Sequence, residues 1–462
     1  MSAASQPGLP LITCLRLGLF QACLGCLAVI FSGLINRIML TELAFPGLLV
    51  GGALAFEQFV APARVLFGQF SDAHAIAGRK RVPYVLFGTA LFCGLAVLSV
   101  PLIFRVATLI EQDRQPFLAL GISALCGLFA CYGLAVSLAS TPYLALVIDR
   151  TSEQERPRAV GIIWCMLTVG IVVGAIAISI SLRSLDGVVD PALLEPVLLR
   201  FMAGVAAVVM LLTVVSIWGV EPASDGASQS GHREDGVSLA MAWRLVTCSG
   251  QVLIFFGFLV LFTLSLFLQD PILESYGAQI FGMPIAATAR LNAFWGLGTL
   301  VGLLLAGLWI VPRVGRFSAA RFGCQLIALS LLLLILCGLS PRVVLLQLVL
   351  LLFGLAAGIG TNSALCLMLD LTLPQACGTF VGVWGLGQAL SRALGKLLGG
   401  GLLDLGRLLT GGSESWAAFA LVFVVELGCA LAAIALLSML SLRQFREDTG
   451  RSLERVLAAE IG

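Results

Sequence analysis

Apolar segments long enough to cross a lipid bilayer dominate the sequence. A helix needs about 20 mostly apolar residues to span the hydrocarbon core of a bilayer. The hydropathy pattern predicts twelve such segments, six on each side of a polar central stretch: 14–40, 46–71, 82–104, 117–148, 159–182, 198–219, 245–268, 285–311, 319–339, 342–369, 376–403 and 416–441. Only 11% of the residues are charged, too few to cover the surface of a soluble domain. We therefore expect an all-α integral membrane protein.

The central stretch 221–236, EPASDGASQSGHREDG, has the composition of a linker. It is predicted to be a solvated tether, with a regulatory site as the alternative. The chain then divides into an N-terminal six-helix half at 1–220, a linker at 221–244, a C-terminal six-helix half at 245–441 and a tail at 442–462. The tail is predicted to form a short amphipathic helix on the membrane surface, with docking to a partner protein as a further role.

Basic residues in the loops predict the orientation of the chain. Loops on the side of the N-terminus hold about twice as many Lys and Arg residues as loops on the opposite side. Positively charged loops stay preferentially in the cytoplasm, so both termini are predicted to be cytoplasmic. The first apolar run is too long for the h-region of a signal peptide, and we expect it to remain as a transmembrane helix.

The polar residues argue against several classes of function. A net charge of +2 argues against a nucleic-acid partner. Most of the 13 cysteines fall in apolar runs, including the CxxC pair Cys23 and Cys26, and are interpreted as small hydrophobic residues. The two histidines, His74 and His232, fall outside the apolar runs, and the sequence contains no HExxH, GxSxG or Walker A motif. We expect neither a metal site nor an enzyme.

The two halves resemble each other in sequence. VIDRTSEQERPRAVG (147–161) follows the fourth apolar segment, and MLDLTLPQACGTFVG (368–382) follows the tenth. When these stretches are aligned, Asp149 pairs with Asp370. Repetition of a six-helix unit with the same loop elaborated is typical of a duplicated transporter-type fold.

The loop between the second and third segments points to a family. Twelve spans arranged as six plus six, with a Gly…Asp…Gly-Arg-Lys loop after the second, resemble the major facilitator superfamily. Here five residues, 73–77, separate the acid from the second glycine, where the superfamily loop has two. Together with NRIMLTEL (36–43), GRKRVPYV (78–85) and QDPILESYGAQIFGM (269–283), this loop is similar to the PucC/LhaA-like, or bacteriochlorophyll-delivery, branch, with the look of a cyanobacterial-type member.

The resemblance implies a function in photosynthetic membranes. It implies an assembly factor that binds or delivers chlorophyll or bacteriochlorophyll to nascent light-harvesting or photosystem proteins. The partners it implies are membrane lipid, subunits of those complexes and pigment-synthesis enzymes, in a thylakoid or intracytoplasmic membrane. A secondary transporter that moves a small solute by alternating access is the alternative, because the same fold serves both functions.

The resemblance also assigns roles to the loop residues. In the superfamily the acid and the basic residues of this loop clamp neighbouring helix ends when the cytoplasmic side is closed. Here the matching positions are Gly68, Asp72, Gly78, Arg79 and Lys80. Asp72 is expected at the positive N-terminus of the eleventh span, or paired with Arg150, which follows Asp149. The alternative is a simple positive anchor at the membrane surface.

Polar residues inside apolar segments are costly and mark candidate functional sites. The cavity and pigment-binding candidates are Asn36, Arg37, Glu57, Gln58, Arg64, Gln269, Asp270, Asn292 and Asn362. Arg37 and Asp270 are expected either to form an ion pair that closes the non-cytoplasmic gate or to reach the interface separately. Glu57 is expected either to pair with Arg64 or to act as a protonatable coupling group. Because neither histidine lies in a span, an axial ligand for a pigment would be an Asn, Gln or Glu side chain, a carbonyl or water, and the side-chain candidates are Asn36, Gln58, Gln269, Asn292 and Asn362. His74 is expected to solvate or cap the loop, with ligation at the membrane surface as the alternative.

Glycines spaced four residues apart predict close helix packing. Three such pairs occur in the fifth, eighth and eleventh segments: Gly170 and Gly174, Gly298 and Gly302, and Gly395 and Gly399. In the superfamily the fifth and eighth spans meet across the two halves. We therefore expect these glycines to pack the two halves against each other.

Overall fold

The computed structural model describes residues 11–76, 78–112, 115–151, 156–183, 191–221, 250–340, 342–370, 377–410 and 415–441. No strand occurs among these residues, and a single β-bridge joins Ile76 to Arg79. The predicted all-α class is confirmed. The tail and all but the first residue of the predicted linker lie outside the described residues, so their roles stay predictions.

The described helices of the N-terminal half begin with a long interrupted helix. It runs as α1 Leu11–Val29 and continues through two π-helical turns, η1 Ile30–Ile35 and η2 Ile38–Glu42. The remaining helices of this half are α2 Gly47–Phe59, α3 Ala63–Ala73, α4 Val82–Glu111, α5 Gln115–Arg150, α6 Arg156–Ser181 and α7 Pro191–Ile217.

The described helices of the C-terminal half begin with two helices separated by a turn, α9 Gly250–Phe267 and α10 Leu273–Gln279. The others are α11 Ile285–Leu305, its π-helical extension η4 Ala306–Ile310, α12 Val311–Val314, α13 Arg316–Cys337, α14 Val343–Asp370, α15 Cys377–Thr410 and α16 Trp416–Met439.

Ten helical stretches within the described residues are long and apolar enough to cross a membrane. They correspond to ten of the twelve predicted spans. The two other predicted spans, 46–71 and 376–403, are also helical but have specific features. The first is divided into α2 and α3, and the second is α15, which carries charged side chains such as Arg392 and Lys396.

Proline explains the division of the second span. Pro62 has no N–H to donate to the carbonyl of Gln58, and its ring would collide with that carbonyl in a continuous helix. The chain instead makes tight turns, in which Ala61 N–H donates to the Gln58 carbonyl and Ala63 N–H to the Val60 carbonyl, both at 3.0 Å. The helix resumes at Ala63.

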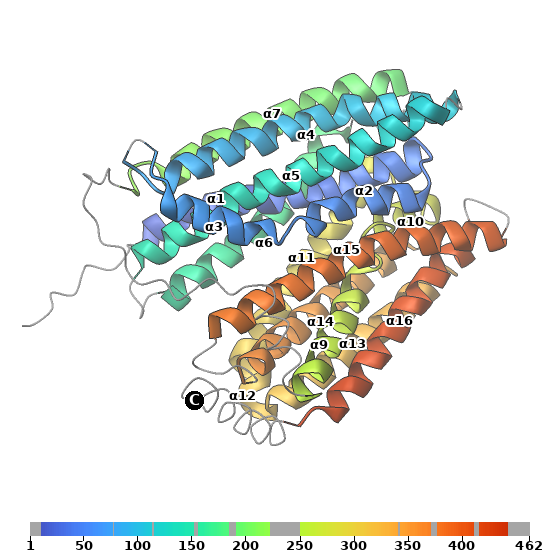
Figure 1. The fold of residues 1–462 in the computed structure, drawn as a ribbon. Helices are drawn as coiled ribbons and strands as arrows, with labels where there is room; N and C mark the ends of the chain where they lie inside the picture. The colour runs from blue at the N-terminus through green and yellow to red at the C-terminus, as the bar shows by residue number, and fades with distance from the viewer. Residues whose placement is uncertain are drawn as a thin grey trace, which may run out of the picture.

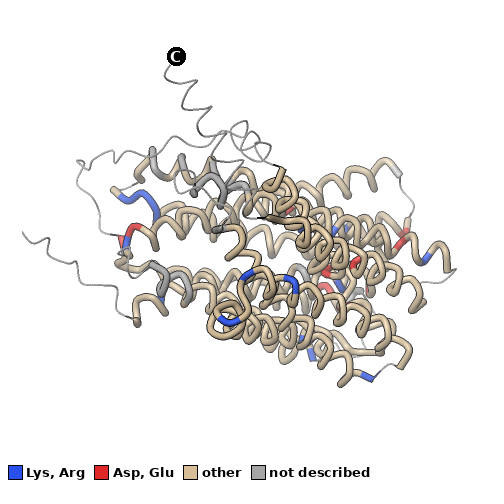
Figure 2. The backbone as a smooth tube through the Cα atoms, turned by 90° about the horizontal axis from the view of Figure 1, so that it is seen from below, with Lys and Arg blue, Asp and Glu red and all other residues tan. Residues whose placement is uncertain are grey.

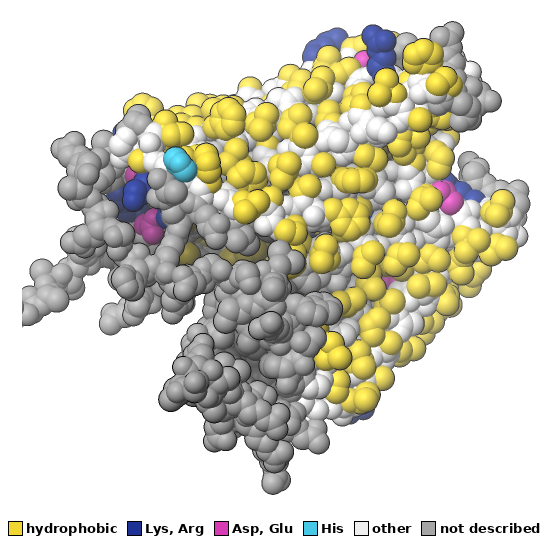
Figure 3. All heavy atoms as spheres, in the orientation of Figure 1, with side chains coloured by type: hydrophobic (Ala, Val, Ile, Leu, Met, Phe, Trp, Pro, Cys, Tyr) yellow, Lys and Arg dark blue, Asp and Glu magenta, His cyan; other side chains and the backbone are white. Residues whose placement is uncertain are grey.

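The helices form two bundles that lie side by side (Figure 1). The bundles meet along two helix pairs, α2 with α15 and α6 with α11. We call the end of the molecule that holds Leu11, residues 78–81 and Leu440 the terminal end, and the end that holds residues 43–46 and 280–284 the far end. Uncharged residues make up most of the chain in Figure 2, and hydrophobic side chains spread over much of the face seen in Figure 3. A surface of this kind suits contact with lipid.

The predicted role of the spaced glycines is wrong in one respect. They do allow close helix approach, but within each half. The contacts are Gly170 and Gly174 with Ala22 and Cys26 of α1, Gly298 and Gly302 with Leu351 and Leu355 of α14, and Gly395 and Gly399 with Phe267 and Leu268 at the end of α9. Small residues permit close approach to any neighbour, so their spacing did not identify which helix they contact.

Candidate functional site

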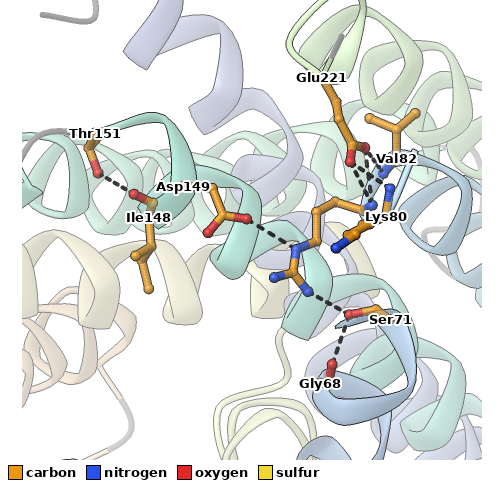
Figure 4. A network of polar contacts seen from close by, with 9 residues as sticks. Gly68, Ser71, Lys80, Val82, Ile148, Asp149, Thr151 and Glu221 are labelled. Carbon is orange, nitrogen blue, oxygen red and sulfur yellow. Dashed lines mark hydrogen bonds and ion pairs between the residues drawn. The ribbon is translucent and has the colours of Figure 1, made fainter. Parts of the chain in front are cut away.

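A buried arginine organises the elbow between α3 and α4 (Figure 4). Arg81 directly precedes α4 and is 6% exposed. Its Nε donates to Asp149 Oδ2 near the end of α5 at 3.2 Å, and its Nη1 donates to Ser71 Oγ in α3 at 2.7 Å. Ser71 Oγ donates in turn to the Gly68 carbonyl at 3.0 Å. One guanidinium thus connects the ends of α3 and α5 to the start of α4.

A carboxylate from beyond α7 caps the start of α4. Glu221 accepts the N–H of Lys80 at 2.6 Å, that of Arg81 at 3.0 and 3.1 Å, and that of Val82 at 2.8 Å. The first N–H groups of a helix have no partner within the helix, and the helix dipole favours a negative charge there. Glu221 therefore joins the end of α7 to α4, although sequence composition placed it in the linker.

A tight turn explains why Arg81 enters the interior while the two preceding basic residues do not. Ile76 and Arg79 exchange main-chain hydrogen bonds of 2.9 and 3.1 Å, and Gly78 between them has a φ of 72°. Glycine adopts this left-handed conformation without steric cost. The side chains of Arg79 and Lys80 are exposed. The predicted clamp role of these two side chains stays a prediction, and the buried contacts of the elbow belong to Arg81.

The described contacts of the elbow all join helices of the N-terminal half. The ion-pair partner of Asp149 is Arg81, and Arg150 beside it is half-buried. The side chain of Asp72 lies outside the described residues, so its expected contact with the eleventh span or with Arg150 stays a prediction. The described part of the elbow therefore fixes one half internally.

A second cluster of polar groups joins the two halves toward the far end. Asn36 and Arg37 lie between the π-helical turns η1 and η2, a backbone form often found at functional sites. Asn36 Nδ2 donates to the Pro271 carbonyl at 2.7 Å. Arg37 donates to Thr288 Oγ1 through Nη1 and to the Met283 carbonyl at 3.2 Å through Nη2. These contacts join the end of the first predicted span to the segment 271–288, which runs from the end of the seventh predicted span into the start of the eighth.

The expected ion pair between Arg37 and Asp270 is replaced by two other pairs. Arg37 Nη2 lies 3.3 Å from Glu42 Oε1, on its own helix. Asp270 Oδ2 lies 3.8 Å from Lys396 Nζ of α15, within the C-terminal half. Aligning the ends of the two spans predicted that Arg37 and Asp270 would meet. In the structure their side chains contact different partners, Glu42 and Lys396.

The other predicted cavity residues are less connected. Glu57 lies 3.4 Å from the amide of its neighbour Gln58. The side chain of Arg64 lies outside the described residues, and the break at Pro62 removes the continuous helical face that the Glu57–Arg64 pair required. Asn362 Nδ2 donates to the Leu303 carbonyl at 3.1 Å within the C-terminal half.

Two buried amides keep an unused oxygen. Asn36 Oδ1 and Gln269 Oε1 have no hydrogen-bond partner among the residues that the structure describes. Both residues are buried, at 0% and 4% exposure. An unpaired buried carbonyl oxygen costs free energy. Asn36 belongs to the cluster between the halves, whereas Gln269 bonds to Leu266 and Glu426 within the C-terminal half.

The far end is closed by a cap that crosses the two halves. Asp404 of α15 accepts the N–H groups of Gly47 and Leu48, the first residues of α2, each at 2.7 Å. Main chain meets main chain beside this cap, where Gly51 lies against the Lys396 carbonyl and Gly400 against the Gly47 carbonyl. These glycines, and not the predicted pairs, bring α2 and α15 together.

A buried acid in this cluster makes stability depend on pH. Glu274 lies on α10, outside the ten helices that can span a membrane, and accepts a hydrogen bond from Asn292 at 2.5 Å. Burial raises the pKa of Glu274 from about 4.5 to about 8, although the Arg37 guanidinium opposes the shift. Between these values the folded protein holds a proton that the unfolded chain releases, so stability falls as pH rises.

We therefore expect the thermal midpoint of the protein in detergent to decrease between pH 5 and 8, and Glu274→Gln to reduce that decrease. The glutamine stays neutral and keeps an oxygen for Asn292. Differential scanning fluorimetry across this pH range measures both slopes. Equal slopes for the two proteins would contradict the assignment.

No group of three or more metal-ligating side chains was found within the described part of the chain. Cys23 and Cys26 are free thiols in the interior of the N-terminal half.

Comparison with known proteins identifies relatives over most of the chain. The family model described as "PUCC protein" matches residues 34–445. The chain is 30% identical over 415 residues to the "Uncharacterized protein in puhA-bchM intergenic region" of Rhodobacter capsulatus. That alignment covers 87% of this chain and 82% of the relative. It is 29% identical over 411 residues to "Protein PucC" of Rhodovulum sulfidophilum, covering 88% of each. It is 30% identical over 415 residues to the "Bacteriochlorophyll synthase 44.5 kDa chain" of Rhodobacter capsulatus, covering 88% of this chain and 90% of that one.

Solved structures share the fold. A point mutant of the nucleoside transporter NupG superposes with a TM-score of 0.68 at 15% identity, covering 93% of this chain and 99% of that one. A bacterial homologue of the human lysosomal transporter Spinster, in an inward-facing and unoccupied conformation, gives 0.68 at 14% identity, covering 95% and 97%. The fold is thus that of the major facilitator superfamily, in an integral multi-pass membrane protein. The expectation of a cyanobacterial-type member stays a prediction.

Proposed function

Because the chain belongs to the PucC protein family, we propose that it is a non-enzymatic assembly factor that binds chlorophyll or bacteriochlorophyll and delivers it to nascent light-harvesting or photosystem proteins. The observation that carries the proposal is the family match, which extends over residues 34–445 and so includes both the elbow and the far-end cluster. The names of two relatives refer to PucC and to bacteriochlorophyll synthase. The membrane is a photosynthetic one, with both termini in the cytoplasm.

The contacts between the halves support a stable binding scaffold. Asp404 caps α2 from the other half, and Arg37 and Asn36 bond to main-chain carbonyls across the same boundary. Such contacts hold the two bundles in one arrangement, as a protein that presents a bulky cargo requires.

The interior amides do not fit a pigment as its axial ligands. Oxygen suits magnesium, and Asn36 Oδ1 and Gln269 Oε1 are free of hydrogen bonds among the described residues. However, both residues are almost fully buried by protein. A macrocycle needs an open face beside its ligand, so a different part of the surface has to receive it.

A secondary transporter remains the second candidate. The observation that favours it is the unsatisfied oxygen of Asn36 in the cluster between the halves, where a small polar solute would find an acceptor. The shared fold with a nucleoside transporter shows that the architecture permits this function.

Purification from a phototrophic host distinguishes the two functions. We expect protein isolated in mild detergent to carry a red chlorophyll or bacteriochlorophyll band in about a one-to-one ratio, because pigment binding is the proposed activity. Absorption spectroscopy of the monodisperse peak measures it, and an unrelated transporter of the same fold purified from the same host is the control. A pigment-free protein that exchanges a labelled solute in liposomes would replace the first function with the second.

A further inference from the structure

A buried carboxylate of α16 lies at the break between α9 and α10. Glu426 is 0% exposed. Its Oε1 accepts the N–H of Gln269 at 3.3 Å, in the turn 268–272 that separates the two helices. Its other oxygen, Oε2, has no hydrogen-bond partner among the residues that the structure describes. A buried carboxylate with an unpaired oxygen is strongly unfavourable, so this site calls for a positive charge beside Oε2.

The neighbouring basic side chains of α15 are directed to a different acid. Lys396 Nζ lies 3.8 Å from Asp270 Oδ2. Arg392 also faces Asp270, and its guanidinium lies over the ring of Phe267 at 4.4 Å from the ring centroid. Asp270 in turn places a second negative charge near Glu426. Neither basic side chain therefore supplies the partner that Glu426 Oε2 lacks.

A second unpaired oxygen belongs to the same turn. Gln269 is 4% exposed, and its Oε1 has no partner among the described residues. Its Nε2 donates to the Leu266 carbonyl at 3.4 Å, so the amide lies back along the last turn of α9. The C-terminal end of a helix carries unsatisfied carbonyls and a partial negative charge. The carboxylate, the amide oxygen and the helix end thus form an electronegative centre, which suits a hard cation with oxygen ligands.

The charge of this centre indicates the kind of cation. One carboxylate and one neutral amide balance a single positive charge. The N–H that Glu426 Oε1 accepts favours the ionised form of the carboxyl group, which a bound metal cation needs and a bound proton would remove. The C-terminal ends of interrupted membrane helices are known to coordinate sodium ions. We propose that Glu426, Gln269 and the carbonyl end of α9 bind a sodium ion.

The bound ion would stabilise the contact between the two halves. The same turn carries Pro271, whose carbonyl accepts Asn36 Nδ2 of the N-terminal half at 2.7 Å. An ion that fixes the turn also fixes the position of this carbonyl. Asp270, with 24% of its side chain exposed, lies on the turn and gives a cation a route from the surroundings. The site is independent of the pigment and would serve either candidate function.

Sodium binding to the detergent-solubilised full chain tests the proposal. The probe is radiolabelled Na⁺ in a scintillation proximity assay, together with the thermal midpoint in sodium, potassium or N-methyl-D-glucamine chloride at equal ionic strength. We expect saturable binding of a single Na⁺ and the highest midpoint in sodium chloride, because a ligand that binds only the folded state stabilises it. Glu426→Gln should abolish both effects. Glu111→Gln, which changes an exposed glutamate at the end of α4, is the matched control and should keep both.

A second variant tests the site while keeping the carboxylate. Gln269→Leu removes the unpaired amide oxygen, and we expect it to weaken Na⁺ binding by about tenfold. The proposal is overturned if the unchanged protein binds no labelled Na⁺, or if Glu426→Gln binds it equally well. Equal midpoints in all three salts, with a higher midpoint for Glu426→Gln, would mean that Glu426 holds a proton instead. None of these readouts involves pigment, so the proposed function stands or falls separately.

Discussion

Gly51→Ala should destabilise the protein strongly, whereas Gly52→Ala, one position along the same helix, should have almost no effect. A Cβ on Gly51 would overlap the main-chain carbonyl oxygen of Lys396 in the opposite half. A Cβ on Gly52 would meet Leu397 Cδ1 at 3.5 Å, an ordinary van der Waals contact. Both variants replace glycine by alanine in the same helix, so their effects on helix propensity and on side-chain hydrophobicity are the same.

The expected cost comes from backbone that cannot move aside. Overpacking a close contact typically costs about 1–3 kcal/mol. Here α2 would have to move away from α15. The hydrogen bonds from the N–H groups of Gly47 and Leu48 to Asp404 join the same two helices and would be weakened as well. We therefore expect a destabilisation in the upper part of that range, together with loss of the contacts between α2 and α15 at the far end.

The thermal midpoint of each purified variant in detergent measures the effect on stability. The yield of light-harvesting complexes in a phototrophic strain that lacks its own family member measures the effect on the proposed function. We expect Gly51→Ala to lower both and Gly52→Ala to match the unchanged protein. Equal midpoints for the two variants would show that the halves are not in contact through Gly51.

The glycine result shows what spacing can and cannot predict. Hydropathy predicts that residues 46–71 are apolar and helical, and the spacing of Gly170 and Gly174 predicts a close helix contact. The close contact holds in the structure, and residues 46–71 are helical except for the break between α2 and α3. The identity of the neighbouring helix depends on how the bundles are arranged in space, and a single sequence carries no direct signal of that.

The sequence predicted where the elbow lies in the chain but not which of its residues make the buried contacts. Three consecutive basic residues, 79–81, are indistinguishable by charge, and only the turn at Gly78 decides which one points inward. Glu221 lies in a stretch of linker composition, yet it caps a helix that begins 139 residues earlier in the chain. Composition describes the average environment of a segment and therefore misses one residue with a specific long-range contact.

A carboxylate caps a helix at each end of the N-terminal half, but the two caps join different parts of the protein. In each case a carboxylate from a distant part of the chain accepts the first N–H groups of a helix, Glu221 for α4 and Asp404 for α2. The Glu221 cap joins helices of one bundle, whereas the Asp404 cap joins the two bundles. The far end is thus closed by main-chain contacts, while the described elbow stiffens a single bundle.

Glu221→Ala should accordingly loosen the start of α4. It removes an acceptor from three main-chain N–H groups and a negative charge from the N-terminus of the helix. Loss of a helix cap costs about 0.5–2 kcal/mol, and the lost connection to α7 adds to that figure. We expect a lower thermal midpoint and faster amide exchange at Lys80, Arg81 and Val82.

Glu111→Ala is the matched control, because Glu111 is an exposed glutamate at the opposite end of the same helix. A negative charge at a helix C-terminus is unfavourable, so its removal should leave the midpoint unchanged or raise it slightly. Hydrogen–deuterium exchange of a peptide that covers residues 79–90 separates the two variants. Unaltered protection of that peptide in Glu221→Ala would mean that the three amides do not depend on this carboxylate, and that the elbow is held by Arg81 alone.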